Sequence, residues 1–211
     1  MNRKELMQIA KPILFNTEMV RAIKEGRKTE TRRVIKRDIT NFCDVDTDGE
    51  LLDYEDSYGD FINPADLCRY KPGDILYVRE TWRKHSPGTD AFIYRADYPD
   101  EYHRKMGFKP SIHMPKEAAR IFLRITKVRV ERLQAIKNEQ ILNEGIKKEE
   151  FDRYIGQMPE KTEEYVRLCH LIPWRELWDS TIKKQDLSKY GWDANPWVWI
   201  IEFERIEVEE A

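Results

Sequence analysis

The stretch Gly26-Arg27-Lys28-Thr29-Glu30-Thr31-Arg32-Arg33 marks the change from helix to strand on which the predicted fold depends. Residues 16–25, just before it, begin with a capping asparagine and place apolar side chains on one helical face. A glycine in the position of Gly26 is typical of the residue that ends a helix. The β-branched residues that follow favour extended chain. The sequence therefore predicts a helix that turns into a strand at Gly26.

Lys28 and Thr31 lie at this turn and carry side chains that suit acyl-transfer chemistry. Side chains three apart on a regular strand point to opposite faces, so the two converge only if Lys28 belongs to the turn and Thr31 opens the strand. A threonine hydroxyl becomes a nucleophile when a base takes its proton, and a lysine is such a base only when its pKa is lowered. Burial lowers that pKa, as do cationic neighbours such as Arg27, Arg32 and Arg33. The alternative is a solvated basic turn without chemistry.

Composition limits the partners that this chain of 211 residues can bind. Charged residues make up 36% of the chain but the net charge is only −2, so binding of nucleic acid requires a local basic patch. Such a patch lies between Arg21 and Arg37, where eight cations accompany two glutamates. Three cysteines without Cys-x-x-Cys spacing fit a reducing cytoplasm better than a disulfide framework or a zinc site. With no apolar core of a signal peptide and no apolar run of membrane-spanning length, the sequence predicts a soluble cytoplasmic protein.

Residues 36–67 form an acidic stretch that contains a possible calcium loop. Positions from Asp44 to Glu55 satisfy the calcium-loop pattern of EF-hands, including the final glutamate. An EF-hand needs a helix on each side, whereas the residues before this loop are β-branched and Asp48-Gly49 is a hairpin-turn signal. A hairpin is therefore the favoured interpretation, and calcium binding is the alternative.

The rest of the chain alternates predicted strands and helices, which indicates an α+β protein. Alternating or continuous apolar runs predict strands, at 11–15, 75–82, 91–95, 120–133 and 197–203. Periodic apolar residues predict helices, at 138–145 and at 163–178, the second interrupted at Pro173. The long run at 120–133 is of the kind used in small barrels.

Several further residues are candidates for a site. Glu144 lies in the last turn of a predicted helix, where the helix dipole disfavours a carboxylate unless a cation compensates it. Glu80 and Trp82 share one face of the predicted strand 75–82, and the alternative for them is an exposed carboxylate beside a core tryptophan. His113 lies between prolines near Ser111, where a packed loop residue is the simpler interpretation.

Together these segments resemble the ASCH domains of the PUA-like superfamily of small β-barrels. The family signature G-x-K-x-x-E-x-R stands here as Gly26, Lys28, Thr31 and Arg33, with threonine in place of the glutamate. The bacterial N4-acetylcytidine amidohydrolases of that superfamily are similar in having Gly-Arg-Lys-Thr-x-Thr-x-Arg, with their catalytic lysine and threonine on Lys28 and Thr31. When the chain is aligned with these enzymes from Leu133 onward without gaps, their catalytic glutamate corresponds to Glu144.

The resemblance extends to segments that are not part of this motif. Residues 70–78 are similar to the turn and strand of the family, and residues 199–203 are similar to its last strand. The resemblance implies a single domain over residues 1–211, a small mixed β-barrel with flanking helices and insertions at about 35–68, 83–119 and 146–195. In its length the chain looks like the ASCH proteins that phages and prophages encode.

The resemblance also implies an activity, namely removal of an acyl group from N4 of a modified cytidine without a metal or organic cofactor. Thr31 would attack the acyl carbonyl, Lys28 would move the proton, and Glu144 would hold the lysine or activate water. The substrate would be a modified nucleoside or RNA, with Arg33, Glu80, Trp82, Ser111 and His113 as candidate binding residues. Two rivals stay open, an RNA-binding module without chemistry that uses the basic patch, and a ribonuclease.

Overall fold

The computed structural model describes residues 1–36, 42–45, 51–55, 58–86, 88–89, 91–102, 106–149, 151 and 162–208. The chain forms two compact units. Unit 1 comprises residues 1–26, 72–126 and 203–211, and unit 2 comprises residues 27–71 and 127–202. Each of the three predicted insertions therefore falls wholly within one unit.

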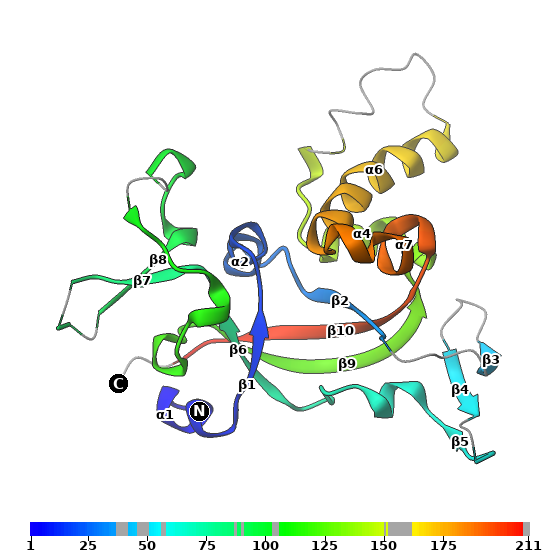
Figure 1. The fold of residues 1–211 in the computed structure, drawn as a ribbon, viewed down its shortest axis with the longest axis horizontal. Coiled ribbons are helices and arrows are strands. Elements are labelled where there is room, and N and C mark those ends of the chain that lie inside the picture. Colours follow the sequence, from blue (N-terminus) through cyan, green and yellow to red (C-terminus); the bar gives the residue numbers. More distant parts are fainter. Residues whose placement is uncertain are drawn as a thin grey trace. The chain divides into compact units, whose positions relative to one another are not determined.

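A mixed five-stranded sheet is the main element of regular structure (Figure 1). Its strand order is β1-β6-β9-β10-β2, with bounds Lys11–Leu14, Ile75–Arg79, Phe122–Arg132, Trp197–Ile206 and Glu30–Val34. The two longest strands, β9 and β10, each run from one unit into the other. The predicted α+β class is confirmed, and closure of the sheet into a small barrel stays a prediction.

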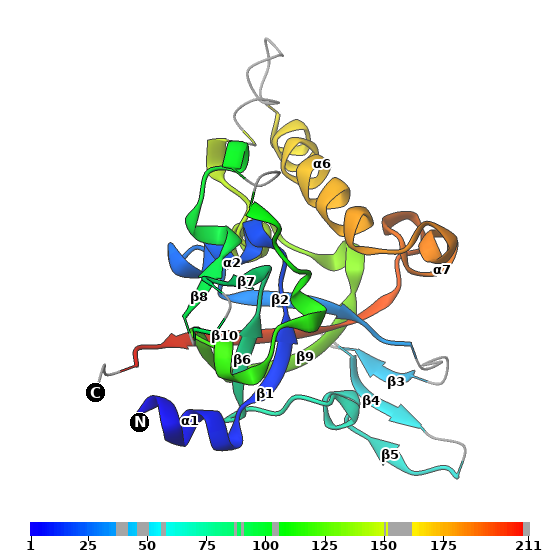
Figure 2. The ribbon, with the colours of Figure 1, turned by 60° about the vertical axis from the view of Figure 1, so that its left-hand side comes forward.

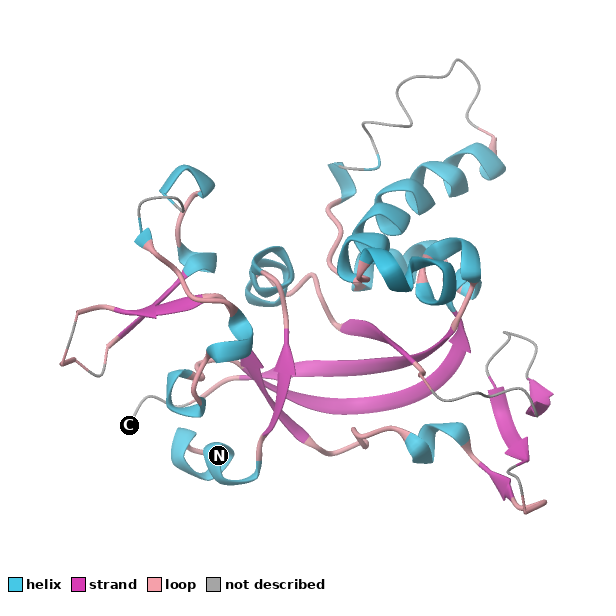
Figure 3. Cartoon of the chain, in the orientation of Figure 1, coloured by secondary structure: helices cyan, strands magenta, loops and turns pink. Residues whose placement is uncertain are grey.

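Besides its sheet strands, unit 1 contains two helices, a hairpin and several short helical turns (Figure 3). Helix α1 spans Arg3–Ile9 and helix α2 spans Thr17–Lys24, while β7 (Trp82–Lys84) pairs antiparallel with β8 (Phe92–Tyr94). Strand β1 runs parallel to β6, and β6 runs antiparallel to β9. The core of this unit is apolar and contains Leu6, Tyr77, Trp82, Met114 and Phe122.

Unit 2 combines β2, paired antiparallel with β10, and three helices that lie together in Figure 1. These are α4 (Asn138–Asn143), α6 (Glu163–Thr181) and α7 (Leu187–Tyr190). Buried Trp174 and Trp178 of α6 pack with Ile141 of α4 and with Val198 and Ile200 of β10. The helices are thus held on the sheet by large apolar side chains, whose burial is the main favourable contribution to folding.

A small sheet in unit 2 surrounds the segment for which a hairpin and an EF-hand calcium loop were the two interpretations. Strands β3 (Phe42–Val45), β4 (Leu51–Glu55) and β5 (Phe61–Ile62) lie side by side in Figure 2, with β3 antiparallel to β4. The predicted turn at Asp48-Gly49 lies outside the described residues. Its two flanking segments are paired strands, as a hairpin requires, and not the helices of an EF-hand.

Two predicted elements were wrong in their extent. The strand predicted over 75–82 ends at Arg79, and a new strand begins at Trp82, because Trp82 turns away to pair with Tyr94 of β8. The helix predicted to break at Pro173 continues through it to Thr181. Pro173, Trp174 and Trp178 are all buried, so packing of this part of α6 opposes the cost of the backbone hydrogen bond that proline removes.

Candidate active site

Lys28 is buried in unit 2, just before β2, and three acceptors surround its amine. The exposed fraction of its side chain is 0%, and Nζ donates to Glu144 Oε2 at 2.7 Å, to Glu144 O at 2.9 Å and to Glu30 O at 2.9 Å. An ammonium carries three protons and has no lone pair, so it matches three acceptors. In this conformation the amine is therefore held as an ammonium against the carboxylate of Glu144.

The backbone brings Lys28 and Glu144 together although they are far apart in the sequence. The two residues form an isolated antiparallel bridge, and the Thr29 N–H donates to Asn143 O at 2.9 Å. Arg27 Nη1 donates to the carbonyl of Gly145. Glu144 closes the last turn of α4, where the negative end of the helix dipole disfavours a carboxylate. The predicted compensating cation is Lys28.

Arg32 and Glu30 complete what we call the buried charge cluster, which consists of Lys28, Glu30, Arg32 and Glu144. Arg32 Nη1 donates to Glu30 Oε1 at 2.6 Å and to Glu144 Oε1 at 3.0 Å. The ring of Trp174 lies over the guanidinium, with 5.7 Å between its centroid and Cζ. Two cations thus face two carboxylates in a site that is almost closed to water.

A second buried arginine, Arg129 of β9, extends these ion pairs toward β10. Arg129 Nε donates to Glu131 Oε1 at 2.6 Å, and its Nη1 donates to Glu202. Its Nη2 lies 3.8 Å from Glu30 Oε2. Glu30 therefore lies between two arginines.

Burial and charge shift the pKa values of the buried charge cluster in different directions. Burial lowers the pKa of Lys28 below its usual 10.5, while Glu144 opposes that shift, and Arg33 and Arg32 add to it. Burial alone would raise the pKa of Glu144, but the nearby Lys28 and Arg32 outweigh it and hold that pKa below 4.5. Burial raises the pKa of Glu30 against the opposing effect of Arg32. The site thus combines a stabilised carboxylate with an amine whose proton is held less tightly than in water.

Thr31 lies beside this cluster but does not bond to it. Its side chain is buried, and Oγ1 has no hydrogen-bond partner among the described residues. Strand alternation puts Glu30 and Arg32 on one face of β2 and Thr31 on the other. Lys28 Nζ donates to the Glu30 carbonyl, and this carbonyl belongs to the peptide bond that joins Glu30 to Thr31. The amine is therefore held next to the backbone of Thr31.

Arg33, the predicted binding residue of unit 2, follows Arg32 in β2 and is half-buried. Burial lowers its pKa, and the carboxylate of Glu144 opposes that shift. Arg33 Nη1 donates to the carbonyl of Arg32 at 3.2 Å. Arg33 therefore lies within electrostatic range of the buried charge cluster.

The other predicted binding residues, Glu80, Trp82, Ser111 and His113, belong to unit 1. Glu80 is buried and accepts two hydrogen bonds from Arg120, at 2.8 and 3.0 Å. Trp82 is part of the core of unit 1. Ser111 and His113 lie in a short helical turn, and His113 is exposed. Unit 2 builds the buried charge cluster without any of these four side chains.

Sequence reasoning named Arg32 only as a cationic neighbour of Lys28, and it missed Glu30 and Trp174 as members of the site. A local signal existed for Glu30 and Arg32, because Lys28, Glu30 and Arg32 alternate in charge at every second position, as one face of a strand does. Trp174 comes from a distant helix, and no local pattern indicates its contact with Arg32.

The predicted basic patch between Arg21 and Arg37 is not one exposed surface. Lys28 and Arg32 are buried, and Arg21 and Lys24 belong to unit 1. Arg21 pairs with Glu18 at 2.6 Å and with Asp100 at 3.1 Å, and Lys24 pairs with Asp97. Half of the eight cations are therefore either buried or paired with carboxylates. Arg37 lies outside the described residues.

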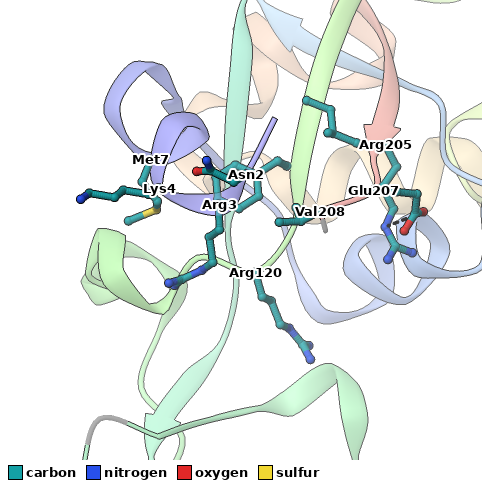
Figure 4. Close-up of a pocket in the computed structure, with 10 residues that line it drawn as sticks. Asn2, Arg3, Lys4, Met7, Arg120, Arg205, Glu207 and Val208 are labelled. Atoms are coloured by element: carbon teal, nitrogen blue, oxygen red, sulfur yellow. Dashed lines mark ion pairs between the residues drawn. The ribbon is translucent and has the colours of Figure 1, made fainter. Parts of the chain in front are cut away.

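A pocket of about 900 Å³ lies in unit 1 (Figure 4). Four cations contribute to its lining, namely Arg3, Lys4, Arg120 and Arg205. Its apolar wall includes Met7 and Val208, and one carboxylate, Glu207, lies 3.7 Å from Arg205. The pocket has the size of a small-molecule site and a positive lining.

Within the described part of the chain, no group of three or more metal-ligating side chains could hold a metal ion. None of the described helices combines the length and apolarity that crossing a membrane requires. Comparison with protein-family models, with curated proteins and with solved structures gave no match.

Proposed function

We propose that this protein is an amidohydrolase that removes an acyl group from N4 of a modified cytidine, as the resemblance to ASCH domains implies. The observation that carries the proposal is the buried ion pair of Lys28 and Glu144. The amine of this pair also donates to the Glu30 carbonyl, which belongs to the residue just before Thr31. A dry pair of this kind keeps a lysine proton within reach of a carboxylate, so a small proton shift inside the pair yields a neutral amine.

The first half of the reaction transfers the acyl group to Thr31. Glu144 takes one proton from Lys28, and the neutral amine then takes the proton of the Thr31 hydroxyl as Oγ1 bonds to the acyl carbon. For this step Lys28 Nζ leaves the Glu30 carbonyl and reaches Oγ1, which lies on the other face of β2 in this structure, so the step requires the turn before β2 to rearrange. Collapse of the tetrahedral intermediate breaks the bond between carbon and N4, and Lys28 returns the proton to the departing amine. The products are cytidine and an ester on Thr31.

The second half of the reaction uses water. The neutral Lys28 takes a proton from a water molecule that attacks the ester carbon, and the same proton then returns to Thr31 Oγ1 as the acid is released. Proton return from Glu144 to Lys28 restores the ion pair. Arg33 or a backbone amide near Gly26 stabilises the oxyanion in both halves.

The experiment that tests this proposal follows release of cytidine from N4-acetylcytidine by the purified protein. Lys28→Ala and Glu144→Ala should each lose at least about 100-fold in rate, the usual size of an acid–base contribution. The control is Lys11→Ala, which removes a partly exposed ion pair with Asp74 in unit 1. If the wild type releases no cytidine, the proposal is wrong for this substrate.

RNA binding without chemistry is a second candidate, and the positive lining of the pocket in Figure 4 favours it. Arg3 donates to the backbone carbonyls of Glu117 and Ala119, and it forms no ion pair with a carboxylate of the described residues. This candidate predicts salt-dependent binding of single-stranded RNA that weakens in the double variant Arg3→Gln with Lys4→Gln. It also predicts that Thr31→Ala binds RNA as the wild type does.

A further inference from the structure

One edge of the Arg32 guanidinium is buried without an acceptor. Nη1 donates to Glu30 and Glu144, whereas Nε and Nη2 have no hydrogen-bond partner among the described residues. The exposed fraction of the Arg32 side chain is 1%. Buried donors of a charged group are costly to leave unpaired, so an orphaned pair of them in a protein calls for an explanation.

The two orphaned groups form one recognition edge. The Nε–H and Nη2–H bonds of a guanidinium are parallel and lie in one plane, and they match a planar partner with two adjacent acceptors. Carboxylates, phosphates and the edges of some nucleobases have this geometry.

Charge decides between these partners. The buried charge cluster is already neutral, because Lys28 and Arg32 face Glu30 and Glu144. Beyond it, Arg129 faces two further carboxylates, Glu131 and Glu202. Arg33, which lies within electrostatic range of Glu144, brings the sum of these charges to zero. An added phosphate or carboxylate would therefore leave these groups with a net negative charge, which is unfavourable in a buried site. The edge needs acceptors but no additional negative charge, and a neutral nucleobase supplies them.

We propose that the Nε/Nη2 edge of Arg32 binds the N3 and O2 atoms of the cytosine ring and thereby selects the substrate base. This inference rests on the proposed function, since it names the part of that substrate which the site recognises. N3 and O2 of an N4-acylated cytosine are adjacent acceptors, whereas uracil carries a hydrogen on N3 and presents a donor there. A buried arginine edge therefore rejects uracil, because the N3–H of uracil would face the N–H of arginine.

The position of Trp174 provides an independent readout. Its ring lies over the Arg32 guanidinium, and its own Nε1 is buried without a partner among the described residues. A base that reaches the Arg32 edge must displace atoms that now cover it. We therefore expect the indole N–H resonance of Trp174, assigned by its loss in Trp174→Phe, to shift when a cytosine ligand binds.

The test measures binding of cytidine, uridine and 3-deazacytidine to the full chain by calorimetry, together with the Trp174 resonance. In 3-deazacytidine a C–H replaces N3, so the ligand keeps its shape and loses one acceptor. We expect uridine and 3-deazacytidine to bind at least about tenfold more weakly than cytidine, the discrimination of a good bidentate contact. Equal binding of all three ligands, or no binding of cytidine, would overturn the inference, and this comparison needs no variant.

Variants then assign the discrimination to Arg32. Arg32→Lys keeps the charge but lacks the two-pronged edge, so it should bind cytidine and 3-deazacytidine alike. The matched control is Arg129→Lys, a second buried arginine whose Nε and Nη1 already have carboxylate partners, and it should keep the preference. Selectivity that survives in Arg32→Lys would overturn the inference. Selective binding of cytidine without hydrolysis of N4-acetylcytidine would support the Arg32 site and refute the proposed chemistry.

Discussion

Lys28 and Glu144 show how burial changes the energetic role of an ion pair. On a surface such a pair contributes little, because water and salt screen both charges. Here the side chains are 0% and 2% exposed, so each charge depends on the other for compensation. Arg32 adds a second bond to Glu144, which makes this carboxylate the centre of the buried charge cluster.

Glu144→Gln should lower the free energy of unfolding by about 3–5 kcal/mol, because it leaves a buried ammonium without its counter-charge. Urea unfolding at pH 7 measures this change. The matched control is Asp74→Asn, which breaks the partly exposed pair with Lys11 and should cost no more than about 1 kcal/mol. Equal costs for the two substitutions would contradict a closed, dry site around Glu144.

Glu144 should also shape the acid limb of stability. Because the folded state holds its pKa below 4.5, the stability gained from the ionised carboxylate is present above pH 4.5 and is lost as the pH falls through the folded value. The difference in unfolding free energy between the wild type and Glu144→Gln should therefore shrink as the pH is lowered from 5 toward 2. Chemical unfolding at a series of pH values measures it, and a constant difference would contradict the assigned shift.

The end of α4 and the start of β2 position the reactive groups. Gly145 follows Glu144 with a φ of 96°, a conformation that side chains with a Cβ rarely adopt. Its carbonyl accepts from Arg27, and the neighbouring Asn143 and Glu144 carbonyls accept from Thr29 and Lys28. The helix end and the turn before β2 thus form one unit of backbone structure.

Gly145→Ala should destabilise the protein by about 1–2 kcal/mol, the cost of a left-handed backbone for a residue with a Cβ. It should also reduce cytidine release, since Glu144 is the adjacent residue. Gly59→Ala is the matched control, because Gly59 lies in the same unit with a φ of 84° but away from the site residues in sequence. Thermal unfolding and the hydrolysis assay together separate the effects. Equal losses of stability in both variants, with full activity retained in both, would contradict a positioning role for Gly145.

The chain crosses repeatedly between the two units. The chain passes between them at 26/27, 71/72, 126/127 and 202/203, so neither unit is one continuous segment. Strands β9 and β10 each contribute residues to both units. Unfolding of one unit alone would therefore interrupt both strands along their length.

We expect the two units to unfold in a single cooperative transition. Trp82 is the only tryptophan of unit 1, so the fluorescence of Trp82→Phe reports on unit 2 alone, while far-UV circular dichroism reports on both. The two denaturation curves of this variant should coincide. Separate midpoints would show that the units fold independently.

Local patterns predicted much of the fold, and non-local packing explains the failures. The helix before Gly26, the strand after it and the helix just before Glu144 all follow from capping residues and apolar periodicity. The break after Arg79 depends on pairing of Trp82 with β8, and the passage of α6 through Pro173 depends on buried tryptophans. The meeting of Lys28 with Glu144 was predicted through the family resemblance, whereas the contact of Arg32 with Trp174 had no local signal.

Thr31 offers the most direct test of the central claim, because its hydroxyl is buried and has no partner among the described residues. Thr31→Val replaces that hydroxyl with a methyl group of similar size, so the variant should be at least as stable as the wild type. Thr31→Ser keeps a hydroxyl. We predict that Thr31→Val folds and releases no cytidine from N4-acetylcytidine, while Thr31→Ser retains part of the wild-type rate. Cytidine release by Thr31→Val at the wild-type rate would contradict the account.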